Sequence, residues 1–311
     1  MKKIIVDCDP GHDDAFALML AWGSPDIELV GVTTVAGNQS IDKVTRNALS
    51  VAEVCRISGV PFAQGLHRPL VRKPETATSV HGESGLDGPV LPEPSATLDR
   101  RHAVDLIIDL IMENPPGSIT LVPTAPLSNI AAAALREPRI VERVREVVAM
   151  GGAIRGGNRT AVTEFNIAVD PEAARVVFEQ PWKVTMVGLD VTHKALASRD
   201  VRAAVEALGT EPSRFFADVL SFFADAYLKD QGFEAPPVHD PCAVAYVIDP
   251  SILTVRPAPI DVELHGELTT GMTVVDLRAP AASDCHTHVA TDIDVDRFWS
   301  LMLDALERVG A

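Results

Sequence analysis

The stretch KIIVDCDPGHDDAFALMLAW (residues 3–22) predicts the fold class of the chain. Residues 3–9 have the short apolar run of a buried strand, Pro10 and Gly11 make a tight turn, and a helical pattern begins at Asp13. A strand that passes through a short turn into a helix is the first half of a β-α-β unit. The stretch therefore predicts an α/β protein whose first strand ends among aspartates.

The same alternation of apolar strands and periodic helices continues along most of the chain. We expect strands at 27–37, 61–65, 118–124, 144–152 and 183–191, and helices at 41–55, 101–113, 127–135, 171–179, 197–208 and 211–229. Further on, we expect a helix from about 240, strands at 259–264 and 271–278, and a last helix at 294–308. This order indicates a mostly parallel sheet flanked by helices. No linker or repeat divides it, so we predict one domain over residues 1–311.

Two stretches interrupt this order. Residues 66–100 carry several prolines and glycines and show little periodicity. A structureless stretch of this length inside a domain is usually functional or disordered. We expect it to form a mobile lid over a site, and we expect a second mobile loop at 223–238. The contacts that distinguish one ligand from another would come from these two loops.

The composition excludes several classes of protein. The 311 residues are 47% hydrophobic and carry a formal net charge of −16, with no basic run. Proteins that bind nucleic acid or anionic membranes normally present a basic face, so neither partner is expected. The chain has no apolar run of about 18 residues and no signal peptide pattern. Its four cysteines form no CxxC pair and indicate a reduced, cytoplasmic protein.

Four aspartates crowd the end of the first predicted strand: Asp7, Asp9, Asp13 and Asp14. Strand alternation puts the first two on one face, at the carboxyl end where open α/β sheets bind ligands. The other two begin the helix, whose N-terminal dipole favours negative charge. One such aspartate would be only a helix cap, but four that converge on one point need a positive partner. Oxygen ligands favour a hard cation, Ca²⁺ or Mg²⁺.

The segment VDCDPGHDDAFAL (6–18) resembles the N-terminal signature of the inosine-uridine-preferring nucleoside hydrolases, D-x-D-P-G-x-D-D. Seven further segments resemble family blocks in the same order: GNQSIDKVTRNAL (37–49), VHGESGLDG (80–88), PTAPLSNIA (123–131), MGGAIRGGN (150–158), TEFNIAVDPEAA (163–174), LDVTHK (189–194) and VHDPCAVA (238–245). The resemblance spans nearly the whole chain. It implies a Rossmann-like sheet with additional C-terminal helices and strands, and a homodimer or homotetramer.

The resemblance also implies a reaction, the hydrolysis of the N-glycosidic bond of purine or pyrimidine ribonucleosides to ribose and free base. Family members hold Ca²⁺ at the bottom of the pocket, and the matching ligands are the side chains of Asp9, Asp14 and Asp240 and the Thr124 carbonyl. Asp9 would also be the general base for the metal-bound water. Sugar hydrolysis passes through an oxocarbenium-like state, which nearby carboxylates stabilise.

The remaining implied residues contact the substrate. The sugar contacts would come from Asp13, Asn38, Asn158, Glu164 and Asn166. If the TEFN segment is extended, Glu164 and Asn166 point the same way. His239, beside Asp240, would protonate the departing base, with Tyr227 as its assistant. His81 contacts substrate or closes the pocket, or is a plain loop histidine. The other histidines are interpreted as supporting or surface residues: His12, His193, His286 and His288.

Three alternatives remain open. An aspartate-dependent phosphotransferase of the haloacid dehalogenase type also uses D-x-D after its first strand, with Mg²⁺, but Gly11 and His12 depart from its usual pattern. A non-catalytic ribose-binding protein could share the fold. The third alternative is a hydrolase of a modified nucleoside or another N-ribosyl compound. It stays open because the sugar site can be recognised in the sequence and the base site cannot.

Overall fold

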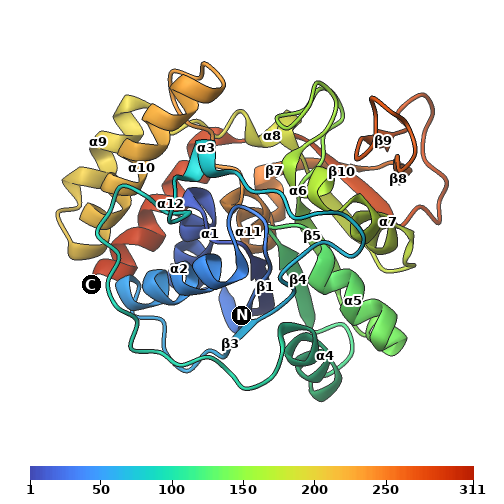
Figure 1. Cartoon of the computed structure of the whole chain (residues 1–311), viewed down its shortest axis with the longest axis horizontal. Coiled ribbons are helices and arrows are strands. Elements are labelled where there is room, and N and C mark those ends of the chain that lie inside the picture. Colours follow the sequence, from blue (N-terminus) through green and yellow to red (C-terminus); the bar gives the residue numbers. More distant parts are fainter.

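The computed structural model describes residues 1–311, and its centre is an eight-stranded sheet with helices on both faces (Figure 1). The sheet consists of β1 (Lys2–Cys8), β2 (Ile27–Thr34), β3 (Phe62–Gln64), β4 (Ile119–Pro123), β5 (Glu146–Met150), β6 (Val184–Val187), β7 (Leu253–Pro257) and β10 (Thr287–Ile293). A separate two-stranded sheet pairs β8 (Ile260–Val262) with β9 (Thr273–Val275).

The helices follow the β-α order that the sequence predicts. They are α1 (His12–Gly23), α2 (Ile41–Val54), α3 (Thr78–His81), α4 (Ala103–Glu113), α5 (Ser128–Arg136), α6 (Phe165–Val169), α7 (Pro171–Glu179), α8 (Leu189–Thr192), α9 (Arg199–Ala207), α10 (Glu211–Asp230), α11 (Pro241–Ile248) and α12 (Val295–Gly310). Two short 3₁₀ helices lie at Pro138–Ile140 and Pro250–Ile252. No helix combines the length and the apolar character that crossing a membrane would need.

The strand order β3-β2-β1-β4-β5-β6-β10-β7 confirms the predicted mostly parallel sheet. Neighbouring strands run parallel from β3 to β10, and only β7 is antiparallel, to β10. The chain builds outward from β1 to β3 and then returns to the other side of β1 with β4. The order therefore reverses between β1 and β4, and open α/β sheets bind ligands outside the carboxyl ends at such a point.

Strand β1 separates two hydrophobic cores. Ile4 and Val6 belong to the core that α1, α11 and α12 cover, whereas Ile5 belongs to the core under α4 and α5. All three side chains are completely buried. A strand that is covered on both faces has a continuous apolar run, which is why the alternation of a half-exposed strand is missing here. This burial fixes the end of β1, and the aspartates that follow it, in the interior of the protein.

Several predicted elements need correction. The strand expected at 183–191 ends at Val187, because α8 begins directly after Gly188. The first half of the loop expected at 223–238 is wrong, because residues 223–230 are the last turns of α10. Phe223 and Tyr227 recur there at helical spacing and are buried. In the segment 66–100 only α3 is regular. The mobility of both segments stays a prediction.

The prediction lacks the strands β7 and β10, the short helices α3, α6 and α8, and the two 3₁₀ helices. The sequence of β10, THVATDI, mixes polar and apolar residues, and its burial alternates only in part. The strand forms because it pairs with β6 on one side and with β7 on the other. A local pattern cannot show such a pairing, since the partners lie far away in the sequence.

Asn129 on α5 joins three parts of the chain below the site. Its side-chain amide donates to Asp7 Oδ1 at 2.8 Å and to the Thr34 carbonyl at 2.9 Å. Its Oδ1 accepts from the Leu66 N–H at 3.0 Å. These hydrogen bonds lie in the protein interior, where a polar group without a partner lowers the stability of the fold. Asn129 therefore holds β1, β2 and the start of the segment 66–100 together.

We expect Asn129→Ala to lower the free energy of unfolding by about 2–4 kcal/mol, because the buried Asp7 carboxylate loses one of its donors. The measurement is urea denaturation followed by circular dichroism. Gln180→Ala is the control. Gln180 is the half-buried residue after α7, and its amide donates only to the Val176 carbonyl, so the value should change by less than about 0.5 kcal/mol. Equal losses in both variants would contradict the role given to Asn129.

Candidate active site

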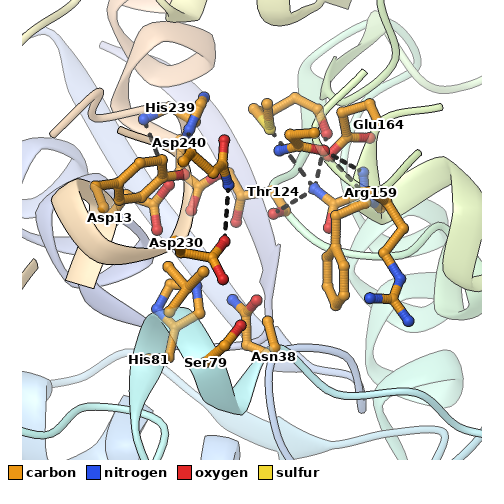
Figure 2. Close-up of a pocket in the computed structure, with 18 of the residues that line it drawn as sticks. Asp13, Asn38, Ser79, His81, Thr124, Arg159, Glu164, Asp230, His239 and Asp240 are labelled. Carbon is orange, nitrogen blue, oxygen red and sulfur yellow. Dashed lines mark hydrogen bonds between the residues drawn. The ribbon is translucent and has the colours of Figure 1, made fainter. Parts of the chain in front are cut away.

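A cleft of about 650 Å³ opens at the carboxyl ends of β1, β4 and β5 (Figure 2). It lies at the reversal of the strand order. Most of the predicted site residues line it: Asp13, Asn38, His81, Thr124, Asn158, Glu164, Asn166, Tyr227, His239 and Asp240. The other two, Asp9 and Asp14, are fully buried and lie below the lining, where they bond to it. The fold thus brings all predicted site residues to one place.

Asp9 and Asp14 form the floor of the cleft. Asn38 joins them, because its backbone N–H donates to Asp9 Oδ2 at 2.6 Å and its side-chain amide donates to Asp14 Oδ2 at 3.3 Å. Asp14 also accepts from the Gly11 N–H at 3.0 Å and from the Thr124 hydroxyl at 2.9 Å. Asp9 Oδ1 is buried and has no hydrogen-bond partner. One oxygen of the floor is therefore free to accept from a ligand.

Asp7 does not belong to this group. Its Oδ1 accepts from the Thr33 hydroxyl at 2.6 Å and from the Asn129 amide at 2.8 Å. It does not line the cleft. The expectation that all four N-terminal carboxylates converge is therefore wrong for Asp7. Its side chain leaves β1 on the same face as Ile5, and α5 covers that face.

Asp13, Asp14 and Asp240 could share one metal ion. One carboxylate oxygen from each lies within 4.8 Å of the others, and all three residues are buried. Burial, followed by the charges of the neighbouring aspartates, raises the pKa of Asp240 well above its usual range. The same two causes raise the pKa of Asp13 to about 8. None of the ion pairs in the chain relieves this repulsion.

These residues fit a divalent cation. The donors are all oxygen atoms, which hard cations prefer. Asp9 Oδ1 has no hydrogen-bond partner, and no positive side chain balances the carboxylates. Both observations indicate that a cation is required. In the structure, the carboxylates that lie close enough to share an ion are those of Asp13, Asp14 and Asp240. The resemblance in the sequence implies a different ligand set, in which Asp9 takes the place of Asp13.

Glu164 stands across the cleft from Asp13 and His239 (Figure 2), and Asn166 follows it at the start of α6. Glu164 caps this helix and accepts from the N–H groups of Asn166 and Gly152, each at 2.9 Å. Burial raises the pKa of Glu164 to about 7. The Asn166 amide donates to the Thr124 carbonyl at 3.0 Å. The condition set in the sequence analysis holds only as far as Glu164, whose backbone is extended, because α6 begins at Phe165 and Asn166 is already helical.

Asn158 arrives through the glycine-rich turn that precedes α6. Its Oδ1 accepts from the Phe165 N–H at 2.9 Å. Gly152 has φ of 72°, a left-handed conformation that suits glycine. Its N–H is thereby turned toward Glu164. Backbone contacts in and around this turn thus position Asn158 and Glu164 on the polar side of the cleft.

His239 is held from both ring nitrogens. Nδ1 lies 2.7 Å from the Thr192 hydroxyl, and Nε2 lies 2.8 Å from the Tyr227 hydroxyl. Burial lowers the pKa of His239 to about 3, so the ring is neutral near pH 7. The geometry makes Tyr227 and His239 one connected unit at the cleft. His193 packs against the His239 ring at a centroid distance of 5.6 Å but does not line the cleft.

His81 lines the cleft from α3, and His12 supports it from below. The two Nδ1 atoms are 3.1 Å apart, and His12 Nε2 lies 2.8 Å from the Asp87 carbonyl. The His12 ring also stacks on Phe223 at 5.0 Å. His12 thus ties the segment 66–100 to α1 and α10. His286 and His288 lie outside the cleft.

Several lining or supporting residues are missing from the predicted site residues, among them Arg159, Thr192, Asp230 and Gln231. Asp230 and Gln231 follow Tyr227 by three and four residues on or next to α10. Positions with this spacing share a helix face, so the pattern could have indicated them. Arg159 follows Asn158 directly. Thr192 lies in the block LDVTHK (189–194), but no local pattern indicates its contact with His239.

Comparisons with known proteins agree on one family. The family model for inosine-uridine preferring nucleoside hydrolases matches residues 4–300. An inosine-uridine preferring nucleoside hydrolase from Crithidia fasciculata is 55% identical over 310 residues, which cover 99% of this chain and 98% of that protein. The pyrimidine-specific ribonucleoside hydrolase RihB from Escherichia coli is 42% identical and is covered to 96%, with 97% of this chain. The solved purine-preferring ribonucleoside hydrolase from Gardnerella vaginalis superposes with a TM-score of 0.94 at 33% identity, over 99% of both chains.

Gly37 offers a test of the floor. A Cβ atom at this position would lie 2.1 Å from Asp9 Oδ2 and 2.8 Å from Pro126 Cδ. We expect Gly37→Ala to push the Asp9 carboxylate out of place and to weaken the binding of a divalent cation at least tenfold. Titration calorimetry with CaCl₂ on metal-free protein measures this affinity.

Gly117→Ala is the matched control. Gly117 has a left-handed backbone and open space around its Cβ position. The added methyl group costs some stability there but should leave the cation affinity unchanged. An unchanged affinity in Gly37→Ala would show that Asp9 is not a ligand of the cation and would favour the set of Asp13, Asp14 and Asp240.

Proposed function

The chain belongs to the inosine-uridine preferring nucleoside hydrolase family, and on that premise we propose how its cleft hydrolyses the N-glycosidic bond of ribonucleosides. The reaction takes a ribonucleoside and water and gives ribose and the free base. The observation that carries the assignment of the site is the group of buried carboxylates without a countercharge at the floor of the cleft. They need a cation, and they surround the place that a sugar would occupy.

The proposed cofactor is Ca²⁺, held by the side chains of Asp9, Asp14 and Asp240 and by the Thr124 carbonyl. Asp13 lies close enough to this group to add its charge. When bound, a divalent cation lowers the pKa of a water ligand and orients the ribose diol. Ca²⁺ would accept a flexible set of oxygen ligands such as these, whereas Mg²⁺ demands a near-octahedral site and keeps more of its water.

Asp9 is the proposed general base. Its Oδ2 is held by the Asn38 N–H, and its Oδ1 remains free to take a proton from the attacking water. A carboxylate that is fixed through one oxygen presents the other in a constant direction. Such placement is a large part of general-base catalysis, because the base must lie within hydrogen-bond reach of the water.

The polar side of the cleft is the proposed sugar site. As the N-glycosidic bond breaks, positive charge develops on the ribosyl ring. The carboxylates of Asp13 and Glu164 stabilise that charge from fixed positions. Asn38, Asn158 and Asn166 contribute amide groups to the ribose hydroxyls. Asn158 and Asn166 are oriented by their bonds to backbone groups of Phe165, Thr124 and Met150. Asn38 is oriented by its bonds to Asp9 and Asp14.

The departing base requires a proton, and the proposed source is the pair of Tyr227 and His239. The two side chains are joined at 2.8 Å, and both line the cleft. One proton leaves the attacking water for Asp9 and another reaches the base, so the reaction is balanced overall. His81, on the neighbouring helix α3, is the proposed contact to the nucleoside from the lid.

Family membership removes two of the alternatives, the phosphotransferase and the non-catalytic ribose-binding protein. Hydrolysis of a modified nucleoside or another N-ribosyl compound remains the second candidate, because the sugar site is the better defined half of the cleft. A homodimer or homotetramer and a cytoplasmic location remain predictions.

The test of this function is the release of free base from uridine, cytidine, inosine, adenosine and their 2′-deoxy counterparts. We expect Ca²⁺-dependent release from the ribonucleosides, and much slower release from the 2′-deoxy compounds, which lack half of the diol. Chelation with EGTA should abolish activity, and added CaCl₂ should restore it. Full activity after complete removal of metal would refute the role of the cation. Modified nucleosides in the same panel test the second candidate.

Asp9→Ala should lower kcat at least 100-fold, since a positioned general base is worth about 10²–10⁴-fold. Asp9→Asn keeps the size of the side chain and removes the basic oxygen, so it should show a loss in the same range. Steady-state kinetics on the best ribonucleoside measures both. Asp42→Asn, an exposed aspartate at the start of α2, is the control and should keep full activity. A residual kcat above about one per cent in both Asp9 variants would exclude Asp9 as the base.

A further inference from the structure

The Thr192 hydroxyl contacts His239 from the side of the ring that faces away from the cleft. Thr192 is the last residue of α8 and is completely buried. Its Oγ1 lies 2.7 Å from His239 Nδ1, and the hydroxyl makes no other hydrogen bond. On the other side of the ring, Nε2 lies 2.8 Å from the hydroxyl of Tyr227, which lines the cleft. The imidazole therefore connects a buried hydroxyl to one at the cleft.

Helix α8 holds the Thr192 hydroxyl in a fixed position. At the start of the helix, the Leu189 N–H donates to the Gly152 carbonyl at 2.9 Å. Asp190 Oδ2 accepts from the Ile154 N–H at 2.6 Å. Both bonds join the helix to the glycine-rich turn that precedes α6. The hydroxyl of Thr192 is thus part of the same rigid framework as the polar side of the cleft.

The hydrogen atoms of the three groups can be arranged in two ways, since a neutral imidazole carries a single N–H. If Nδ1 carries the hydrogen, it donates to Thr192, and the hydrogen of the Thr192 hydroxyl has no acceptor in the interior. An imidazolium would donate on both sides and would leave the same hydrogen unpaired. If Nε2 alone carries the hydrogen, Thr192 donates to Nδ1, and Nε2 donates to Tyr227.

Only the second arrangement pairs every buried hydrogen of the three groups. The remaining unpaired hydrogen then belongs to the Tyr227 hydroxyl, which lies at the cleft, where a ligand can accept it. A buried donor without a partner is unfavourable enough to disfavour the other arrangements about tenfold or more.

We propose that Thr192 is a positioning residue, whose hydroxyl fixes His239 as the Nε2–H tautomer so that Tyr227 presents its own proton to the departing base. The proposal rests on the proposed function, in which Tyr227 and His239 are the proton source. As the N-glycosidic bond breaks, its electron pair moves onto the base, and the base takes the Tyr227 proton. The Tyr227 oxygen keeps the electrons of its O–H bond and accepts from Nε2–H. It regains a proton from solvent when the products leave, and His239 keeps its proton throughout.

The tautomer of His239 can be measured in the wild-type protein. Long-range nitrogen–proton NMR spectra of histidine-labelled protein, saturated with CaCl₂, show which ring nitrogen carries the hydrogen. The His239 signals are those that are missing from His239→Asn. We expect the hydrogen on Nε2 and an unprotonated Nδ1 that accepts a hydrogen bond. A hydrogen on Nδ1, or on both nitrogens, would overturn the proposal.

The role in the reaction is tested with Thr192→Val, which keeps the size of the side chain and removes the hydroxyl. The substrates are inosine and uridine, whose bases leave with a proton, and para-nitrophenyl β-D-ribofuranoside, whose nitrophenolate leaves without one. We expect kcat to fall about tenfold or more on both nucleosides, because general acid catalysis is worth about 10²–10⁴-fold and the variant loses part of it. On the nitrophenyl riboside, kcat should stay close to the wild-type value. Thr192→Ser restores the hydroxyl and should recover most of the loss.

Thr185→Val is the matched control, because Thr185 is equally buried and its hydroxyl has no hydrogen-bond partner. It should keep the wild-type kcat on all three substrates. If Thr192→Val loses kcat equally on all three, or on none, Thr192 does not act through the proton donor and the proposal is overturned. If Thr192→Val does not fold, the wild-type spectra still decide the tautomer. If the wild type releases base from no ribonucleoside, the proposed function itself fails, whatever the tautomer.

Discussion

Buried negative charge without a countercharge is the constraint on which the rest of the structure depends. Asp9, Asp13, Asp14 and Asp240 meet where β1 ends. Burial raises the pKa of all four carboxyl groups, and repulsion from neighbouring aspartates adds to this for Asp9, Asp13 and Asp240. A chain under selection for stability alone would not collect such groups. Their arrangement makes sense when a cation and a sugar complete it. The hydrolysis that the family performs requires both a nucleophile and stabilised positive charge.

The surrounding fold holds these carboxylates against their repulsion. Two hydrophobic cores cover the opposite faces of β1. They hold the end of this strand in place, so the carboxylates that follow it cannot move apart. Asn38 and Thr124 follow the neighbouring strands β2 and β4, and they donate to the aspartates from both sides. Asp7 lies two residues before Asp9 and outside this group. Its Oδ1 accepts hydrogen bonds from Thr33 and Asn129 instead. The same sheet thus supports one structural aspartate and a reactive group beside it.

The two sides of the cleft are built differently. On the proposed sugar side, Glu164 and Asn166 are positioned by contacts around a helix start, which fixes their directions closely. On the other side, the lining comes from the end of α10 and from α3, whose segment is held by the His12 contacts. Under the proposed function, a sugar site on fixed contacts and a base site at the ends of elements would allow the base preference to change without disturbing the chemistry.

The sequence by itself determined the β-α order, the parallel sheet and the cluster of aspartates, because periodicity and turn residues are local properties. It also carried enough family blocks to indicate Asp9, Asp14, Asn166 and His239 by position. The tertiary structure alone decided that Asp7 turns away from the group and that Glu164 and Asn166 come from a helix start. It also revealed β10, the Thr192 contact to His239, and Asp230 in the lining of the cleft. These features depend on which face α5 covers and which distant strands pair, and contacts between remote segments leave no local pattern in the chain.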